Sequence, residues 1–325
     1  MTRYFQILVS ENMPSNLPTN TLIINEFSKI QNLLGQEFET ILFDARKGIH
    51  LEALAIAAGT LKMNGALIVL LSNWEKLHSQ IDEDSLRWSG PIEAIATPRF
   101  IAYFKHCIHK YGFPVLYHQN DLKFGRTFQQ LFVNHNATLD QQKIIEQILQ
   151  KESELYFLTA KRGRGKSALA GLLANQLDTK IYLTAPNKSA VNILGEFSQK
   201  EIIFITPDAL FLALQNDPSF SENAWLFVDE AAMLPIAQLT AFSHHFKHIL
   251  FTTTIHSYEG TGRGFELKFK QKINRTFSNF ELIEPLRWSK DDALEAFIDE
   301  LLLLNVEDEF KQTAYDKSKF CQITE

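Results

Sequence analysis

The stretch Leu158-Thr-Ala-Lys-Arg-Gly-Arg-Gly-Lys-Ser-Ala-Leu-Ala-Gly171 decides the fold of this chain, because the residues around it have the order strand, loop, helix. The run before it, from Glu154 to Thr159, is apolar and has strand character. The segment after it, from Ala168 to Leu177, carries apolar residues at helical spacing. A glycine-rich loop in this position predicts a phosphate-binding site.

The loop follows the pattern G-x-x-x-x-G-K-[ST] at Gly165, Lys166 and Ser167, but Ala160 stands where the first glycine is expected. Gly163 adds backbone freedom within the loop. In this pattern, backbone N–H groups hold phosphates, the lysine reaches the terminal phosphates and the hydroxyl binds Mg²⁺. A glycine- and lysine-rich surface turn is the alternative interpretation, so the prediction needs support from elsewhere in the chain.

Composition places the chain among globular proteins with more than one domain. The 325 residues are 45% hydrophobic and 22% charged, with a net charge of −6, so any nucleic-acid surface must be a local patch. Cys107 and Cys321 are far apart and outside any C-x-x-C pair, which argues against a disulfide or zinc site. No signal-peptide pattern and no apolar run near the ~18 residues of a membrane span is found, so we expect a cytoplasmic location and no membrane partner.

The first part of the chain predicts an α/β domain of Rossmann-like type. Two β-prone runs, Thr40 to Asp44 and Gly65 to Leu71, flank a helical pattern from Leu51 to Lys62, which makes a βαβ unit with parallel strands. A further β-prone run is Thr21 to Asn25, and Phe100 to Tyr111 is helical. At the strand end, Asp44 and Arg46 either contact a ligand or form a salt-bridged turn.

A polar, irregular segment from His118 to Asn136 marks the predicted boundary between domain 1–130 and domain 131–325. A new helix then begins, with Thr138 as its expected N-cap. Helicase-like ATPases often recognise adenine with a glutamine upstream of the phosphate loop. Gln141 is the candidate, although Gln142 competes and an ordinary helix residue is equally consistent with the sequence.

The second part predicts a RecA-like P-loop ATPase domain with a parallel sheet. Beyond the loop, its β-prone runs are Lys180–Thr184, Ile202–Ile205, Trp225–Val228 and Ile249–Ile255. Asp229 and Glu230 directly follow one buried strand, so they are expected beside the loop at the same sheet edge. We expect Asp229 to hold Mg²⁺ and Glu230 to orient or deprotonate the attacking water; a helix N-cap is the alternative.

The rest of the chain offers further candidates. Thr252 to Thr254 would sense the γ-phosphate, and the glycine-rich segment Tyr258–Phe265 would present Arg263 to phosphates or RNA. Arg287, between Pro285 and Trp288, is a candidate arginine finger. A stretch of alternating cations and aromatic rings indicates either single-stranded nucleic-acid binding or a half-buried strand: Phe265, Lys268, Phe269, Lys270, Lys272, Arg275 and Phe277.

The motifs TAKRGRGKSALAG, FVDEAAMLPIAQL, TTTIHSYEGTGRGF and PLRW, in this order, resemble the ATPase part of the bacterial tRNA(Met) cytidine acetyltransferases, related to the eukaryotic RNA cytidine acetyltransferases. LFDARKGIHLEALAIAAGTLKMNGALIVLLSNWE resembles their N-terminal domain. The resemblance covers nearly the whole chain. The phosphate loop of this family also begins with Ala, as this chain's loop does at Ala160. The resemblance implies Walker B acids at Asp229 and Glu230. It places nucleotide contacts at Gln141, Arg162, Gly163, Arg164, Gly165, Lys166, Ser167, Ala168, Leu169, Ala170, Gly171 and Arg287.

The resemblance also implies an activity, N4-acetylation of the wobble cytidine of elongator tRNA(Met) with acetyl-CoA and ATP. Because no acetyl-CoA pyrophosphate loop follows Leu304, we expect an ATP- and Mg²⁺-dependent, tRNA-handling module without the acetyl-transfer domain. Acetyl-CoA would then be bound by full-length members and not by this chain. The chain would work with a separately encoded acetyltransferase domain or as part of a longer protein. The alternatives are a truncated remnant that only binds nucleotide or RNA, and an unrelated helicase-like DNA ATPase.

Overall fold

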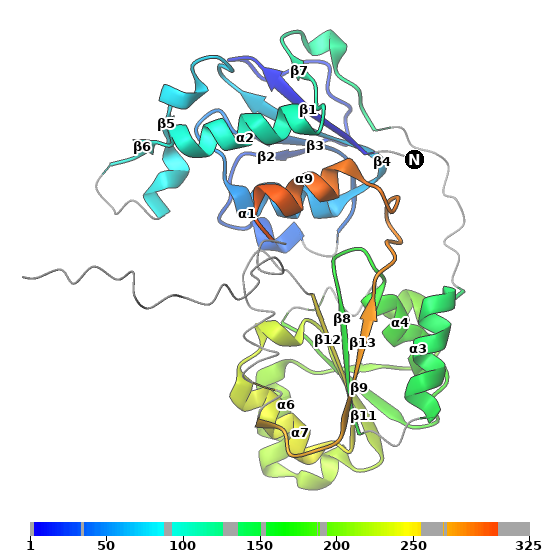
Figure 1. Ribbon diagram of the computed structural model, residues 1–325. Helices are drawn as coiled ribbons and strands as arrows, with labels where there is room; N and C mark the ends of the chain where they lie inside the picture. The colour runs from blue at the N-terminus through cyan, green and yellow to red at the C-terminus, as the bar shows by residue number, and fades with distance from the viewer. Residues whose placement is uncertain are drawn as a thin grey trace, which may run out of the picture.

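The computed structural model describes residues 3–33, 36–87, 93–125, 136–150, 154–186, 188, 194–254, 269 and 272–304 (Figure 1). Two parallel sheets, each with its own helices, dominate this part of the chain. Short 3₁₀ helices occur at Ile30–Leu33, Leu77–Ser79, Glu83–Arg87, Gln119–Asp121, Pro218–Ser221 and Ala231–Met233. Among the helices described, none has the length and apolar character needed to cross a membrane.

The first sheet has the strand order β2-β3-β4-β1-β7, and all its neighbours are parallel. Its strands are β1 (Tyr4–Val9), β2 (Leu22–Ile24), β3 (Phe38–Asp44), β4 (Leu61–Leu71) and β7 (Val115–Leu116). Its helices are α1 (Leu51–Thr60) and α2 (Pro98–Lys110), and β5 (Ile81–Asp82) pairs antiparallel with β6 (Ile95–Ala96). The predicted βαβ unit is therefore present, with α1 between the paired strands β3 and β4.

Side-chain alternation divides the first sheet into two cores. One face, with Phe5, Phe43 and Val69, packs against α1 and α2. The other face, with Leu42 and Ile68, packs against Leu122 and neighbouring irregular segments. Because both faces are buried, the central strands are almost continuously apolar.

The second sheet has the order β10-β9-β11-β12-β8-β13, again all parallel. Its strands are β8 (Leu155–Ala160), β9 (Lys180–Thr184), β10 (Ile203–Phe204), β11 (Ala224–Val228), β12 (His248–Thr254) and β13 (Phe277–Leu282). Its helices are α3 (Leu139–Gln150), α4 (Lys166–Ala174), α6 (Pro207–Asn216) and α7 (Ile236–His245). Helices α3 and α4 share one core with this sheet, and α6 and α7 share the core of the other face.

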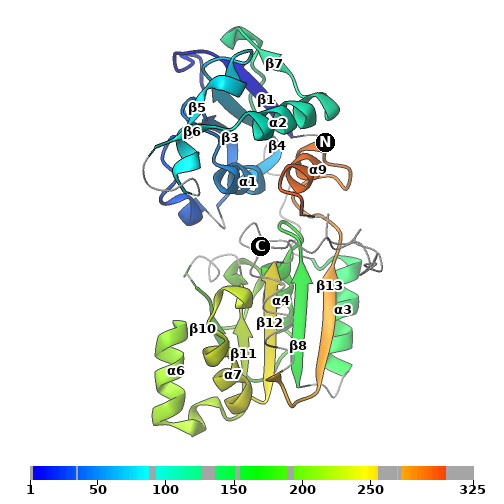
Figure 2. The same ribbon diagram turned by 60° about the vertical axis from the view of Figure 1, so that its left-hand side comes forward.

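Helix α9 (Ala293–Leu301) follows the second sheet in the chain but packs on the first. In Figures 1 and 2 it is the orange helix beside α1 and α2. Its buried face, which includes Leu294, Phe297 and Ile298, lies in the same core as Phe5 and Phe104. The division at residue 130 remains a proposal, and α9 is an element from beyond it that completes the core of the first sheet.

Candidate functional site

The phosphate loop lies between β8 and α4, as the sequence predicts. Ala160 is the last residue of β8 and pairs with Thr254 on one side and Leu282 on the other. It has strand geometry, so a glycine's conformational freedom is not needed there. Gly163 (φ +71°) and Gly165 (φ +81°) do adopt the left-handed conformation that disfavours side chains. These two glycines shape the loop, and α4 begins directly after them with its N-terminus at the site.

Neighbouring residues close tightly over both glycines. A Cβ atom on Gly163 would lie 2.8 Å from the ring of Trp288, and the Leu286 N–H donates to the Gly163 carbonyl at 2.8 Å. A Cβ atom on Gly165 would lie 2.4 Å from Cδ1 of Leu286. The segment carrying the PLRW motif is thus packed directly on the phosphate loop, although it is distant in sequence.

Thr254, the last residue of β12, connects Lys166 of the loop with Glu230, which follows the neighbouring strand β11. Lys166 Nζ donates to Thr254 Oγ1 at 2.9 Å and lies 3.8 Å from Glu230 Oε1. The Thr254 hydroxyl lies 2.8 Å from Oε1 and 3.0 Å from Oε2 of Glu230, and the Thr254 N–H donates to Oε2 at 3.2 Å. Glu230 itself has φ +47°, which is unusual for a residue with a side chain. The carboxylate is therefore oriented toward the loop lysine.

Ser167 and Asp229 form the second contact between the loop and the acidic strand end. Ser167 Oγ donates to Asp229 Oδ2 at 3.3 Å, and the Thr252 hydroxyl donates to Asp229 Oδ1. Burial raises the pKa of Asp229, as does the neighbouring charge of Glu230. A buried carboxylate next to a hydroxyl is the oxygen-donor pair that suits Mg²⁺, and a cation there would relieve the cost of an ionised Asp229. These two residues fit the predicted metal site.

Gln141 touches the loop, but both ends of its amide are bonded to the protein. Its Nε2 donates to the Gly165 carbonyl at 3.1 Å, and its Oε1 accepts from the Thr138 N–H at 3.0 Å. Thr138 Oγ1 in turn accepts from the Gln141 N–H at 3.2 Å, which makes a reciprocal cap of α3. Thr138 therefore caps α3, as the sequence predicts. Only 2% of Gln141 is exposed. Adenine recognition stays a prediction that requires this amide to change partners.

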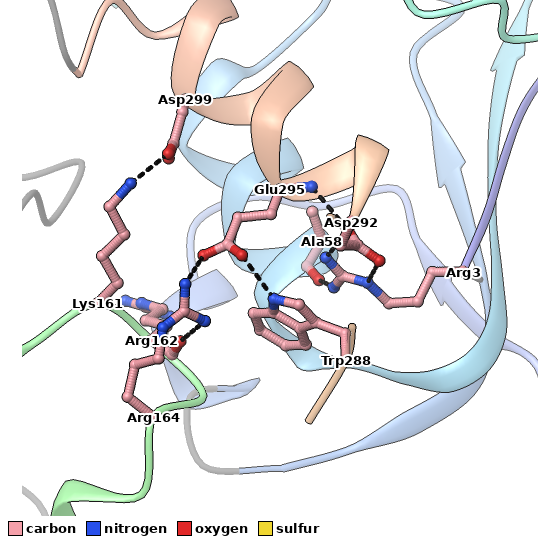
Figure 3. A network of polar contacts seen from close by, with 9 residues as sticks. All are labelled: Arg3, Ala58, Lys161, Arg162, Arg164, Trp288, Asp292, Glu295 and Asp299. Carbon is pink, nitrogen blue, oxygen red and sulfur yellow. Dashed lines mark hydrogen bonds and ion pairs between the residues drawn. The ribbon is translucent and has the colours of Figure 1, made fainter. Parts of the chain in front are cut away.

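The loop cations Lys161 and Arg164 point toward α9 (Figure 3). Arg164 Nη2 lies 2.7 Å from Glu295 Oε1, and Lys161 Nζ lies 2.5 Å from Asp299 Oδ2. Arg162 lines a small cavity beside this network. In this structure α9 holds the guanidinium of Arg164. A contact of Arg164 with nucleotide stays a prediction, which for the side chain requires the ion pair with Glu295 to open.

The predicted positions from Ala168 to Gly171 lie in the first turns of α4. The Leu169 N–H donates to the Gly165 carbonyl at 2.9 Å, and Leu169 is fully buried. A Cβ atom on Gly171 would lie 2.5 Å from the Leu194 carbonyl oxygen. Leu169 and Gly171 therefore support the loop through packing, and the helix N-terminus is the part that faces the site.

Arg287 lies between Leu286 and Trp288, which both contact the loop, but its own side chain pairs with the first domain. Its Nε lies 2.9 Å from Glu37 Oε1. The flanking Trp288 contacts the loop at Gly163. Its role as an arginine finger stays a prediction, which requires the ion pair with Glu37 to open.

The basic aromatic stretch is only partly described. Phe269 is fully buried, and Arg275 binds Glu154 at 2.8 Å and the carbonyls of Ser243, Phe246 and Lys247. Both residues therefore have structural roles, and β13, with its alternating burial, follows directly. The segment Tyr258–Phe265, with Arg263, and the residues Lys268 and Lys270 lie outside the described residues.

At the end of β3, Asp44 and Arg46 form the salt-bridged turn that was one of the two alternatives. Arg46 Nη2 lies 2.7 Å from Asp44 Oδ2, and its Nε lies 2.9 Å from Oδ1. Hydrogen bonding from Arg46 lowers the pKa of Asp44. A further donor from Arg46 reaches the Glu11 carbonyl at 2.5 Å, so this guanidinium is used within the fold.

A parallel sheet with a phosphate loop after β8 and acids after β11 defines the class of P-loop, RecA-like domains. Two family models match the chain. The N-terminal model of the tRNA(Met) cytidine acetyltransferase TmcA covers residues 6–119, and the helicase-domain model of the RNA cytidine acetyltransferase NAT10/TcmA covers residues 157–305. The chain belongs to the RNA cytidine acetyltransferase family, of which it carries the N-terminal and helicase domains.

Curated relatives agree with this assignment. The tRNA(Met) cytidine acetyltransferase TmcA of Haemophilus influenzae is 60% identical over 97% of this chain and 48% of its own length. Those of Actinobacillus pleuropneumoniae and Pectobacterium atrosepticum are 39% and 40% identical, over 88% and 86% of this chain and 49% and 40% of their own lengths. The chain therefore spans about half the length of these relatives.

Proposed function

We propose that this chain binds and hydrolyses ATP as the helicase-like module of a tRNA(Met) cytidine acetyltransferase. One observation carries the proposal: Lys166 and Ser167 of the loop meet Glu230 and Asp229 at the end of a neighbouring strand. A lysine, a hydroxyl and two carboxylates in this relation match the parts that P-loop ATPases use for phosphoryl transfer.

In this proposal, the N-terminus of α4 and the loop N–H groups hold the phosphates, and Lys166 neutralises their terminal charge. Glu230 orients the attacking water and accepts its proton. Ser167 and Asp229 would hold Mg²⁺, which supplies charge neutralisation between the phosphates when it is bound. Thr254 would place Lys166 and Glu230 relative to each other. Arg287 would complete the charge neutralisation after release from Glu37.

The tRNA substrate is proposed from the relatives, whose names state that they acetylate cytidine in tRNA(Met). A module that serves this reaction would work in the cytoplasm, where tRNA is modified, and with tRNA and an acetyl-transfer domain as partners. No described residue is assigned to acetyl-CoA or to acetyl transfer. The proposal for residues 1–325 is therefore limited to ATP and tRNA handling.

The test is steady-state release of phosphate from ATP by the purified chain, with and without tRNA(Met). We expect turnover that tRNA stimulates, and a loss on the order of 10²-fold or more in Lys166→Ala, because one electrostatic contact to a transition state contributes about that much. Equal rates for the wild type and the variant would refute the ATPase proposal. Stimulation by single-stranded DNA but not by tRNA would favour a helicase-like DNA ATPase. ATP binding without turnover would favour a remnant that only binds nucleotide.

A further inference from the structure

Helix α9 makes a direct polar connection to the phosphate loop (Figure 3). The Glu295 carboxylate binds two groups at once: Arg164 Nη2 lies 2.7 Å from Oε1, and Trp288 Nε1 donates to Oε2 at 2.7 Å. Arg164 lies between the two glycines of the loop, and the Trp288 ring contacts Gly163. Glu295 therefore contacts the loop in two ways: directly through Arg164, and indirectly through Trp288, whose ring covers Gly163.

The same helix is fixed to the first sheet. Asp292 caps α9, accepting from the Glu295 N–H at 2.8 Å, and its carboxylate binds Arg3 at 2.6 and 3.1 Å. Both side chains of this ion pair are 1% exposed. The Arg3 guanidinium also lies 3.9 Å above the ring of Trp288 and donates to the Ala58 carbonyl of α1 at 2.5 Å. The position of Glu295 is thus set by the core of the first sheet.

The loop depends on such support. Two of its residues take the left-handed conformation, and glycine loses more conformational entropy on ordering than any other residue. A loop that is already ordered before the ligand arrives does not lose that entropy on binding. Arg164 and Glu295 are well suited to order it, because their side chains are only 8% and 17% exposed and a buried charged pair is strongly directional.

We propose that Glu295 is a positioning residue for the nucleotide site: through Arg164 it holds the phosphate loop in its binding conformation and ties nucleotide affinity to the N-terminal domain. The inference rests on the proposed function, since it concerns the ATP site. Lys161 and Asp299 make a second connection of the same kind one helical turn further along α9, with Nζ and Oδ2 2.5 Å apart. The sequence gives no local sign of these pairs.

The test uses the full chain and measures the Kd for fluorescent methylanthraniloyl-ATP by titration in the presence of Mg²⁺. Glu295→Gln keeps an acceptor for Trp288 but removes the charge that holds Arg164. We expect its Kd to rise about tenfold, within the ~5–150-fold range of coupling between two sites. The KM for ATP should rise more than kcat falls. In an Arg164→Gln background, Glu295→Gln should add little, because the two residues act as one unit.

Glu300→Gln is the matched control. It removes another charged contact of α9, with Lys110 and Tyr111 at 2.7 Å each, on a surface that does not include the phosphate loop. We expect its Kd to equal that of the wild type. If Glu295→Gln does not fold, Glu295→Asp, which keeps the charge on a shorter side chain, carries the test and should show a smaller rise in Kd.

Three outcomes would overturn the inference. A wild-type Kd in the folded Glu295 variants refutes it while leaving the proposed function intact. An undiminished effect of Glu295→Gln in the Arg164→Gln background refutes the route through Arg164. If the wild type binds no nucleotide, while thermal unfolding shows that it is folded, the proposed function fails and the inference fails with it.

Discussion

Thr254 connects the loop lysine with the carboxylate of Glu230. It accepts a hydrogen bond from Lys166, donates to Glu230, and is only 4% exposed. Two residues earlier in β12, the Thr252 hydroxyl donates to Asp229. The sequence suggests that these threonines sense a phosphate, whereas the structure makes them partners of the charged residues. Both roles are compatible, because a hydroxyl can donate to a phosphate oxygen as well as to a carboxylate.

Thr254→Val tests this interpretation. The variant keeps the shape of the side chain but removes the hydroxyl, so Lys166 and Glu230 lose their common partner. We expect kcat for ATP to fall by up to about 10²-fold, the cost of a small displacement of catalytic groups. Steady-state phosphate release measures it. Thr254→Ser, which keeps the hydroxyl, should stay close to the wild type, and a serine variant as slow as the valine variant would contradict the role of the hydroxyl.

Gln141 gives a prediction that separates it from its neighbour Gln142. Gln141→Ala removes the side-chain half of the reciprocal cap, in which Gln141 Oε1 accepts from the Thr138 N–H, and the bond to the Gly165 carbonyl. We therefore expect a loss of about 1–2 kcal/mol in the free energy of unfolding. Gln142 is exposed, so Gln142→Ala should change the free energy of unfolding by less than about 0.5 kcal/mol. Chemical denaturation measures both. If Gln141 also reads adenine, Gln141→Ala will lose its preference for ATP over GTP, whereas an unchanged preference leaves only the structural role.

At the scale of elements, α9 is held on α2 by a titratable contact. Hydrogen bonds from Lys110 and then Tyr111 lower the pKa of Glu300. A carboxyl group with a lowered pKa in the folded state adds stability above its unfolded pKa, about 4.3. That stability is lost as the pH falls through the lowered value. Docking of α9 should therefore weaken only in acid.

We expect Glu300→Gln to unfold at a lower temperature than the wild type at pH 7. Because Glu300 and Lys110 are partly exposed, the free energy of unfolding at pH 7 should differ between the two proteins by less than about 1 kcal/mol. The difference should shrink below about pH 4, where the wild-type carboxyl also becomes protonated. Thermal unfolding followed by circular dichroism over this pH range is the measurement. Curves that stay apart by the same amount in acid would show that another effect of the substitution dominates.

At the scale of the whole molecule, several contacts cross between the parts that carry the two sheets. Phe297 of α9 is fully buried and packs its ring on Phe5 and Phe113, at centroid distances of 5.0 and 5.3 Å. The ion pair of Arg287 with Glu37 is another such contact. The N-terminal domain is thus connected to the phosphate loop through a helix that lies after that loop in the chain.

Arg287→Ala tests whether this ion pair or a catalytic contact is the main role of the arginine. Arg287 and Glu37 are 28% and 42% exposed, so the pair should contribute less than about 1 kcal/mol to stability. A working arginine finger would instead lower kcat by about 10³-fold or more in Arg287→Ala. Glu37→Gln, which releases Arg287, is the control and should not lower kcat. Wild-type turnover in Arg287→Ala would leave the ion pair as its role.

Much of the fold was predictable because its signals are local. The strands β9 and β11 and the helix α1 follow from apolar runs and their spacing, and the loop follows from glycines beside a lysine. The strand β1, in the interior of the first sheet, and the edge strand β13 were not predicted, since short mixed runs such as YFQILV and FSNFEL do not by themselves decide between strand and other structures.

The sequence by itself determined the phosphate loop, the position of the two acids after a buried strand and the parallel direction of the strands in the second sheet, because strand patterns and glycine-rich loops are short-range features. Only the tertiary structure decided the partners of the long polar side chains. Arg164 and Glu295 are 131 positions apart, and Arg3 and Asp292 are 289 apart. No local pattern encodes such pairs, because they arise when α9 packs its apolar face on the first sheet and carries its acids to the phosphate loop.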